Sequence, residues 1–226
     1  GLRASSAPFV CLLNNDLQFT KGWLTEMVEA ARAHSDVGLV NPASNNYGNI
    51  PPNGVSLEEH ARTLLGKRGE VTEMGMCVAF CMLITRGLIE RIGLLSEEVE
   101  RIFFEDEDYG ARTQQAGLRC VVAESAYVWH AEHQTVRKMP ERDALFAKNR
   151  RWCNERWGRW VRSAWPRFDP VVPGSDDLRQ WLEQLVGWAH RRTHVYVYCP
   201  TPQAVTARDL FRSVGLIPHV DVHWRS

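Results

Sequence analysis

The sequence predicts an α/β fold. Apolar runs of strand length alternate along the chain with stretches of helical spacing. The 226-residue chain is 44% hydrophobic and 24% charged, a composition that supports a packed core. Several apolar runs also end in polar clusters, as strands do where an open α/β sheet binds its ligand.

Charge and hydropathy exclude several classes of function. Lys and Arg together number 27, as do Asp and Glu, and a general nucleic-acid binder would usually be basic. The longest apolar run, residues 76–84, is about half the length of a membrane span. The sequence also shows no secretion leader, and its six cysteines form no C-x-x-C. We therefore predict no nucleic-acid partner, no membrane span and a cytoplasmic protein, and peripheral attachment to a membrane stays open.

The N-terminal part predicts most of the sheet. Ser56 with Glu59 three residues later is a capping box that begins one helix, and Gly93 and Gly117 end two others. The predicted strands cover residues 8–13, 37–40, 77–85, 118–123 and 126–129. The predicted helices cover residues 20–34, 56–65, 86–92 and 105–115.

The C-terminal part predicts a separate extension. Residues 140–165 are rich in Trp and Arg and predict one long helix, and residues 166–174 contain three prolines and predict a linker. A helix at 175–191 and a β-α-β unit at 194–224 follow. We therefore divide the chain into a catalytic part at 1–165, a linker at 166–174 and an extension of unknown role at 175–226. Because two strands and one helix bury little surface, the β-α-β unit is expected to pack on something else.

Three polar clusters are candidates for chemistry. Asn14-Asn15-Asp16 follows the first strand, where a carboxylate can hold Mg²⁺ or Mn²⁺, although these are also common turn residues. Glu105-Asp106-Glu107-Asp108 begins a helix whose dipole favours negative charge, and the adjacent Phe103 and Phe104 indicate partial burial. Trp129-His130 ends a strand, where a histidine is either structural or a ligand.

Taken together and in this order, the clusters resemble the family 2 glycosyltransferases of the GT-A (Rossmann-like) fold. This resemblance implies a mixed sheet flanked by helices, present here in part. The resemblance covers roughly residues 5–160, and His130 lies 24 positions after Asp106, where that family places a metal-binding histidine. Its motifs correspond to Phe9–Asp16 with Gly22-Trp23-Leu24, Val37–Pro42, Phe80–Arg86 with Ile92-Gly93, Phe104–Arg112 with Ala116-Gly117, Asn149, and Trp157-Gly158.

The resemblance implies a reaction and a set of residues. The reaction is inverting transfer of a sugar from a nucleotide-sugar donor to a glycan or lipid-linked acceptor, as in polysaccharide biosynthesis, with Mn²⁺ or Mg²⁺ as cofactor. Asp106 would be the catalytic base, with Glu105 beside it, and Asp16 and His130 would hold the metal. Donor or acceptor contacts are expected from Asn14, Asn15, Asn45, Asn46, Asp108 and Trp129.

The sequence also departs from the family's pattern. Asn14 replaces an Asp, Ala79 replaces a Gly, and Ser96-Glu97-Glu98 replaces an Asp-Glu pair. Only seven residues precede the strand predicted at 8–13, whereas the family has a nucleotide-binding half before it, so we expect this chain to lack that half. We also expect the chain to be inactive alone, and either to self-associate or to need the missing half. The alternatives are a non-catalytic binding or scaffold module derived from the same fold, and a metal-dependent hydrolase built on the acidic cluster.

Overall fold

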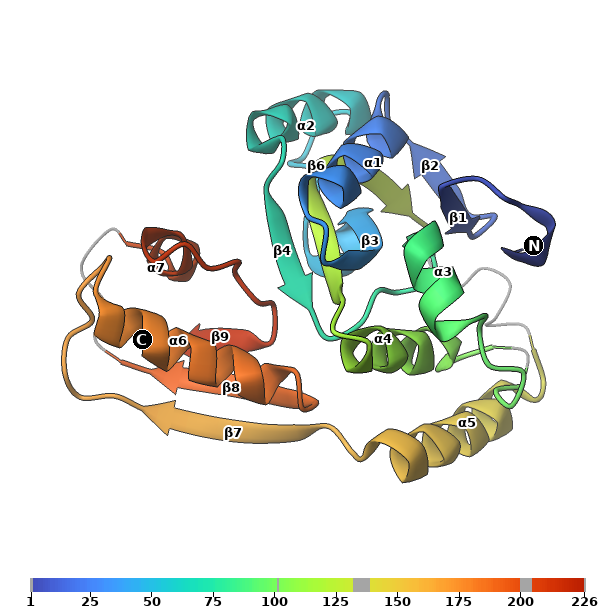
Figure 1. Cartoon of the computed structure of the whole chain (residues 1–226). Coiled ribbons are helices and arrows are strands. Elements are labelled where there is room, and N and C mark those ends of the chain that lie inside the picture. The colour runs from blue at the N-terminus through green and yellow to red at the C-terminus, as the bar shows by residue number, and fades with distance from the viewer. Residues whose placement is uncertain (1, 101, 132–138, 200–204, 226) are drawn as a thin grey trace. The chain divides into compact units, whose positions relative to one another are not determined.

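The computed structural model describes residues 2–100, 102–131, 139–199 and 205–225 (Figure 1). The chain divides into two compact units. One consists of Gly1–Val71 with Met76–Trp157, and the other of Thr72–Gly75 with Gly158–Ser226. Strand β4 (Val71–Met74) therefore belongs to both units: Val71 is in the first unit, and residues 72–74 are in the second.

The first unit is a mixed sheet with helices packed on it. Its strands are β1 (Phe9–Leu13), β2 (Leu17–Phe19), β3 (Val37–Ala43), β5 (Cys81–Thr85) and β6 (Arg119–His130). Its α-helices are α1 (Trp23–Ala33), α2 (Leu57–Leu64), α3 (Arg86–Ile92), α4 (Glu105–Gln115) and α5 (Arg142–Trp157), and its short 3-10 helices are η1 (Leu2–Ala4), η2 (Asn45–Tyr47) and η3 (Leu65–Lys67). The α/β class and the mixed sheet that the sequence predicts are confirmed, and the architecture is consistent with a GT-A-like fold.

The strand order places the predicted polar clusters at one end of the sheet. The order is β1-β5-β3-β6-β2, and only β3 and β6 of these neighbours run parallel. Every residue of β3 is buried, as expected of a central strand. Because β3 and β6 are parallel and β1 pairs with the start of β5 through Leu13 and Cys81, the ends of β1, β3 and β6 lie at the same edge.

Two predictions about strands need correction. Residues 118–123 and 126–129 form one strand, β6, because the polar Glu124 and Ser125 are accommodated rather than breaking it: Ser125 Oγ donates to Glu26 over 2.9 Å, and Lys67 Nζ lies 3.4 Å from Glu124. The short strands β2 and β4 were not predicted, because three or four residues carry too little periodicity.

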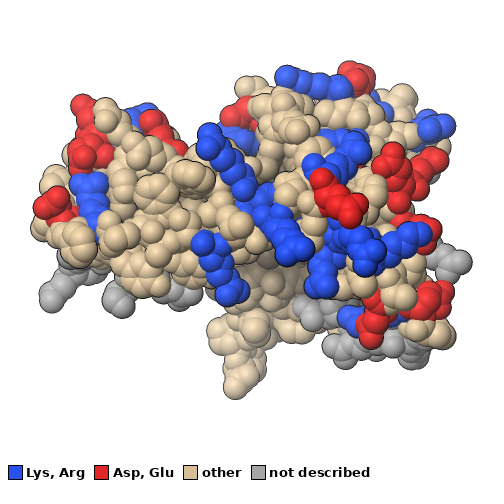
Figure 2. Space-filling view, turned by 90° about the horizontal axis from the view of Figure 1, so that it is seen from below, with Lys and Arg blue, Asp and Glu red and all other residues tan. Residues whose placement is uncertain are grey.

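The predicted helix at 140–165 is also wrong in its second half. Helix α5 ends at Trp157, and Gly158 has a φ of +81°, a conformation that glycine adopts without strain and that ends the helix. Residues 161–166 instead form strand β7 (Val161–Pro166). The arginines and lysine of α5 are exposed in part, and Figure 2 shows basic side chains gathered on this face with acidic side chains beside them.

The second unit contains more than the predicted β-α-β unit. Its sheet is parallel, in the order β7-β8-β9, with β8 at Thr193–Tyr198 and β9 at Val222–Arg225. Helices α6 (Asp176–Ala189) and α7 (Ala207–Ser213) connect these strands. The sequence predicts the helix of the β-α-β unit over residues 204–214, and residue 204 lies outside the described residues. A core of Leu178, Leu182, Val195, Val197 and Phe211 is almost fully buried. The predicted β-α-β unit thus packs against β7 and α6.

No helix in the part of the chain that the structure describes has the length and hydrophobicity to cross a bilayer.

Candidate functional site

Asp16 and His130 meet at the edge of the first unit's sheet. The residue after Asp16 begins β2, which pairs with the end of β6, with Leu17 opposite His130. His130 Nε2 lies 3.1 Å from Asp16 Oδ1 and 3.4 Å from Asn14 Nδ2. The three residues are thus within reach of one shared ligand, although they are far apart in the sequence.

Asn45 and Asn46 hold His130 from the loop that follows β3. Asn45 pairs with the backbone of His130: its Nδ2 donates to the carbonyl over 2.8 Å, and its Oδ1 accepts from the amide over 2.8 Å. Asn46 Nδ2 lies 2.9 Å from His130 Nδ1. In the structure the amides of both asparagines contact His130, and the sugar contacts that the sequence predicts for them stay a prediction.

This arrangement fits a divalent cation. Asp16 Oδ1 is buried, and among the described residues it faces only the His130 ring nitrogen. Asn46 Oδ1 is also buried, with no hydrogen-bond partner in the described part of the chain. Rotation of the Asn46 amide by a half-turn would let Oδ1 accept a hydrogen bond from the His130 Nδ1–H, which leaves the lone pair of Nε2 free to bind a metal beside Asp16.

The loop before β5 connects this pair to the acidic helix. The buried amide of Asn41 holds the loop by accepting from Val78 N over 2.7 Å and donating to the Val78 carbonyl over 2.9 Å. The next residue, Ala79, donates its N–H to Asp106 Oδ2 over 3.1 Å. Phe80 stacks on His130 with ring centroids 5.1 Å apart. Asp16, His130 and Asp106 therefore surround the same short loop.

Asp106 and Glu105 lie in the first turn of α4, both partly buried. Asp106 accepts N–H groups through both oxygens, from Ala79 to Oδ2 and from Glu107 to Oδ1 over 2.9 Å. Burial nevertheless raises the pKa of Asp106 above its ordinary value. Burial, and then the charge of Asp106, raises the pKa of Glu105 to about 7. Raised carboxyl pKa values of this kind are typical of acid–base sites.

The backbone before α4 is strained. Phe103 and Phe104 have φ values of 68° and 72°, a left-handed conformation that costs roughly 1–2 kcal/mol for a residue with a Cβ. Asn149 of α5 is buried, and its Nδ2 donates to the carbonyls of Ile102 and Phe103 over 2.7 and 3.3 Å. Phe146 packs on both phenylalanine rings. Helix α5 thus holds the turn that presents Glu105 and Asp106.

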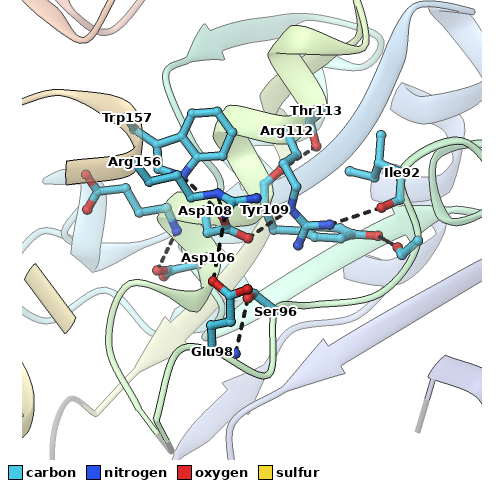
Figure 3. Close-up of polar contacts among 12 residues, drawn as sticks. Ile92, Ser96, Glu98, Asp106, Asp108, Tyr109, Arg112, Thr113, Arg156 and Trp157 are labelled. Atoms are coloured by element: carbon cyan, nitrogen blue, oxygen red, sulfur yellow. Dashed lines mark hydrogen bonds and ion pairs between the residues drawn. The ribbon is translucent and has the colours of Figure 1, made fainter. Parts of the chain in front are cut away.

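Asp108 is not brought to this site (Figure 3). Its side chain is 0% exposed. One carboxylate oxygen accepts from Arg112 Nε over 2.8 Å and the other from Trp157 Nε1 over 3.0 Å. The acidic run predicts Asp108 as an acceptor contact, but a helix turns by about 100° per residue, so Asp108 points away from Asp106 and instead ties α4 to α5.

Trp129 and Asn15 are also separate from the metal ligands. Successive residues of a strand point to opposite faces, so Trp129 faces away from its neighbour His130. It lines an open groove of about 520 Å³ with Gln18, Ile50, Pro51, Asn53, Val55, Ser56 and Leu57. Asn15 is exposed beyond the end of β1. The predicted sugar contact of Trp129 would therefore be made in this groove and not beside His130.

Sequence reasoning missed the residues that assemble the site. Asn41, Phe80 and Asn149 hold its loops, yet the sequence shows them only as polar or aromatic residues within matched segments. A buried position could have been inferred for Asn41, since it continues an apolar strand. Its partner in the loop, Val78, lies 37 residues away and leaves no local pattern.

The raised pKa of Glu105 predicts a pH-dependent stability. Between its ordinary pKa of 4.5 and about 7, the folded state holds a proton that the unfolded state has lost, so the free energy of unfolding falls as pH rises through this window. Glu105→Gln mimics the protonated form and should stabilise the protein by about 2 kcal/mol above pH 7. Denaturant unfolding at about pH 5 and pH 8 measures this, with the exposed Glu97→Gln as control. Parallel pH profiles for wild type and Glu105→Gln would refute the assignment.

The comparisons with known proteins give one finding. Residues 1–93 match the family model described as Glycosyl transferase family 2. Comparison with curated proteins finds no match. The matched segment includes Asp16, Asn45, Asn46 and the loop before β5.

Proposed function

We propose, from the match of residues 1–93 to the model of glycosyltransferase family 2, that the protein transfers a sugar from a nucleotide-sugar donor to the hydroxyl of a glycan or lipid-linked acceptor, with inversion. The family supports sugar transfer in general. The finer proposal is carried by one observation: Asp16, His130 and Asp106 converge on the loop that contains Ala79 and Phe80.

Asp16 and His130 would hold Mn²⁺ or Mg²⁺ through Oδ1 and Nε2. When bound, the cation would stabilise the negative charge that develops on the departing diphosphate. Asn46 would keep the proton on His130 Nδ1, and Asn45 would fix the end of β6, so that Nε2 stays directed at Asp16. Asn14 lies close enough to Nε2 to contact the cation's remaining ligands.

Asp106 would remove the proton from the attacking acceptor hydroxyl. Its two backbone hydrogen bonds fix the carboxylate, and its raised pKa makes it a better proton acceptor than an ordinary aspartate. Glu105, whose pKa lies near 7, would orient the acceptor beside it. A single displacement assisted by a base gives inversion at the anomeric carbon.

The metal assignment is tested by binding. Calorimetric titration of Mn²⁺ in the presence of a nucleoside diphosphate should show binding to the wild type and a loss of about 100-fold or more in affinity for Asp16→Asn, because the negative charge of a ligand is removed. The matched control is Asp36→Asn, a surface change at the opposite end of β3. Transfer should require Mn²⁺ or Mg²⁺ and an acceptor.

Three results would contradict the proposal. Unchanged Mn²⁺ affinity in Asp16→Asn would show that Asp16 is not a ligand of the metal. Nucleotide binding with no transfer, even by the full-length protein, would favour a scaffold module. Release of free sugar without an acceptor would favour a hydrolase.

A further inference from the structure

Histidines are concentrated in the second unit. Four of the eight in the chain, His190, His194, His219 and His223, lie between residues 190 and 223. They form two pairs with the same spacing of four.

The parallel register of β8 and β9 brings the two pairs together. Val195 lies opposite Val222 and Tyr196 opposite His223, so His194 lies beside Asp221 at the start of the two strands. The rings of His190 and His219 are 5.5 Å apart, and those of His194 and His223 are 5.9 Å apart. The fold thus gathers imidazole and carboxylate groups at one end of this sheet.

We propose that His194, Asp221 and His223 form a binding site for a Zn²⁺-type transition metal ion. One ligand atom from each residue lies within 4.8 Å of the others, and His194 Nδ1 lies 2.9 Å from Asp221 Oδ1. Ligand atoms around tetrahedral zinc are roughly 3.4 Å apart, so small side-chain rotations would complete the site. Two histidines with one carboxylate suit Zn²⁺, Co²⁺ or Ni²⁺ and leave a position for water or another ligand.

The surroundings of these residues favour a site that an ion can enter. Asp221 is buried, whereas the His194 side chain is 35% exposed. Trp160 stacks on His194 with ring centroids 4.9 Å apart, and Tyr196 stacks on His223 at the same distance. These aromatic contacts hold both imidazoles in place before any ion binds, which lowers the entropic cost of binding.

Gly75 permits this arrangement. A Cβ added there would lie 2.7 Å from Trp160 Cη2 and 3.2 Å from Asp221 Oδ2. Any side chain at this position would therefore displace the tryptophan that supports His194. This makes Gly75→Ala a test of the site that leaves all three ligands present.

The neighbouring group of Glu73, His190 and His219 is less suited to a metal. His219 Nδ1 accepts the backbone N–H of Asp221 over 3.1 Å, so in the neutral ring Nε2 carries the proton and has no lone pair for an ion. His190 Nε2 lies 2.7 Å from Glu73 Oε1, a contact of the same kind as that of His194 with Asp221, so the protonation of His219 is what distinguishes the two groups. Since Glu73 and His219 also pair through the backbone, this group supports the start of β9.

The experiment is titration of the full chain, without any polyhistidine tag, with Zn²⁺ by calorimetry and with Co²⁺ by absorption spectroscopy. It is performed in an Asp16→Asn, His130→Gln background, so that its outcome is independent of the proposed transferase site. We expect one bound ion per chain. His223→Gln and His194→Gln should each weaken binding by about 100-fold or more, and Gly75→Ala should weaken it as well.

Two matched variants locate the site. His190→Gln, in the neighbouring group, and His34→Gln, in the first unit, should leave the affinity unchanged. Thermal unfolding without metal establishes that every variant is folded. Absence of Zn²⁺ binding, equal binding by His223→Gln and the parent, or loss of binding in His190→Gln would each overturn the proposal.

Discussion

Replacement of Asp106 by Asn should reduce the turnover of the full-length protein by about 100-fold or more while leaving its fold and its metal affinity nearly unchanged. The amide has one acceptor oxygen, so it can keep the hydrogen bond from Ala79 or the one from Glu107 and loses the other. This should cost about 1 kcal/mol, and the start of α4 is expected to stay folded. The amide cannot take a proton from the acceptor hydroxyl. The measurement is the initial rate of sugar transfer at saturating donor and Mn²⁺.

A matched variant separates loss of the base from loss of charge. Asp143→Asn removes an acidic group whose side chain is 91% exposed at the start of α5, and it should transfer sugar at the wild-type rate. Turnover of Asp106→Asn close to that of Asp143→Asn would remove Asp106 from its proposed role. An equal loss of metal affinity in Asp106→Asn would instead indicate that it binds the cation.

Replacement of Asp108 by Ala should destabilise the protein by about 3–5 kcal/mol. Asp108 is fully buried, and its loss would leave the Arg112 guanidinium, only 17% exposed, without its carboxylate. Trp157 would lose its acceptor at the same time, so the contact between α4 and α5 would weaken. Denaturant unfolding monitored by tryptophan fluorescence measures the change in free energy.

The surface pair of Asp36 and Arg119 is the natural control for Asp108. The Asp36 side chain is 48% exposed, and Asp36→Ala should cost about 1 kcal/mol or less, because solvent screens exposed ion pairs. Similar costs for the two variants would contradict a structural role for Asp108. The contrast between Asp106 and Asp108, two residues apart, separates a residue of the site from one that supports the fold.

Some of the site could be predicted from the sequence because its chemistry lies in short segments. Asp16 after an apolar strand, Asp106 at a helix start and His130 at a strand end are each local patterns. Their order along the chain resembles family 2 glycosyltransferases, and the match of residues 1–93 confirms this recognition over that segment. The roles of these residues stay predictions that the experiments above test.

Helix and strand geometry decides which sequence neighbours lie together, and a short motif does not show this. Asp108 belongs to the same acidic run as Asp106, but the turn of α4 directs it to Arg112 and Trp157. Trp129 precedes His130, but strand alternation places it on the opposite face. The predicted helix at 140–165 ignored Gly158, whose positive φ ends α5 and allows β7 to form.

The sequence by itself determined the α/β class, most strands and helices, and the residue types of the proposed transferase site, because hydrophobic periodicity, caps and short motifs are local properties. Only the tertiary structure decided which of those residues meet. Three sets of contacts join segments between 27 and 85 residues apart. Asn149 hydrogen-bonds the strained turn at Phe103, Asn45 and Asn46 contact His130, and His194 lies beside Asp221 and His223. Such contacts depend on strand register and helix packing, which leave no signal in any single segment.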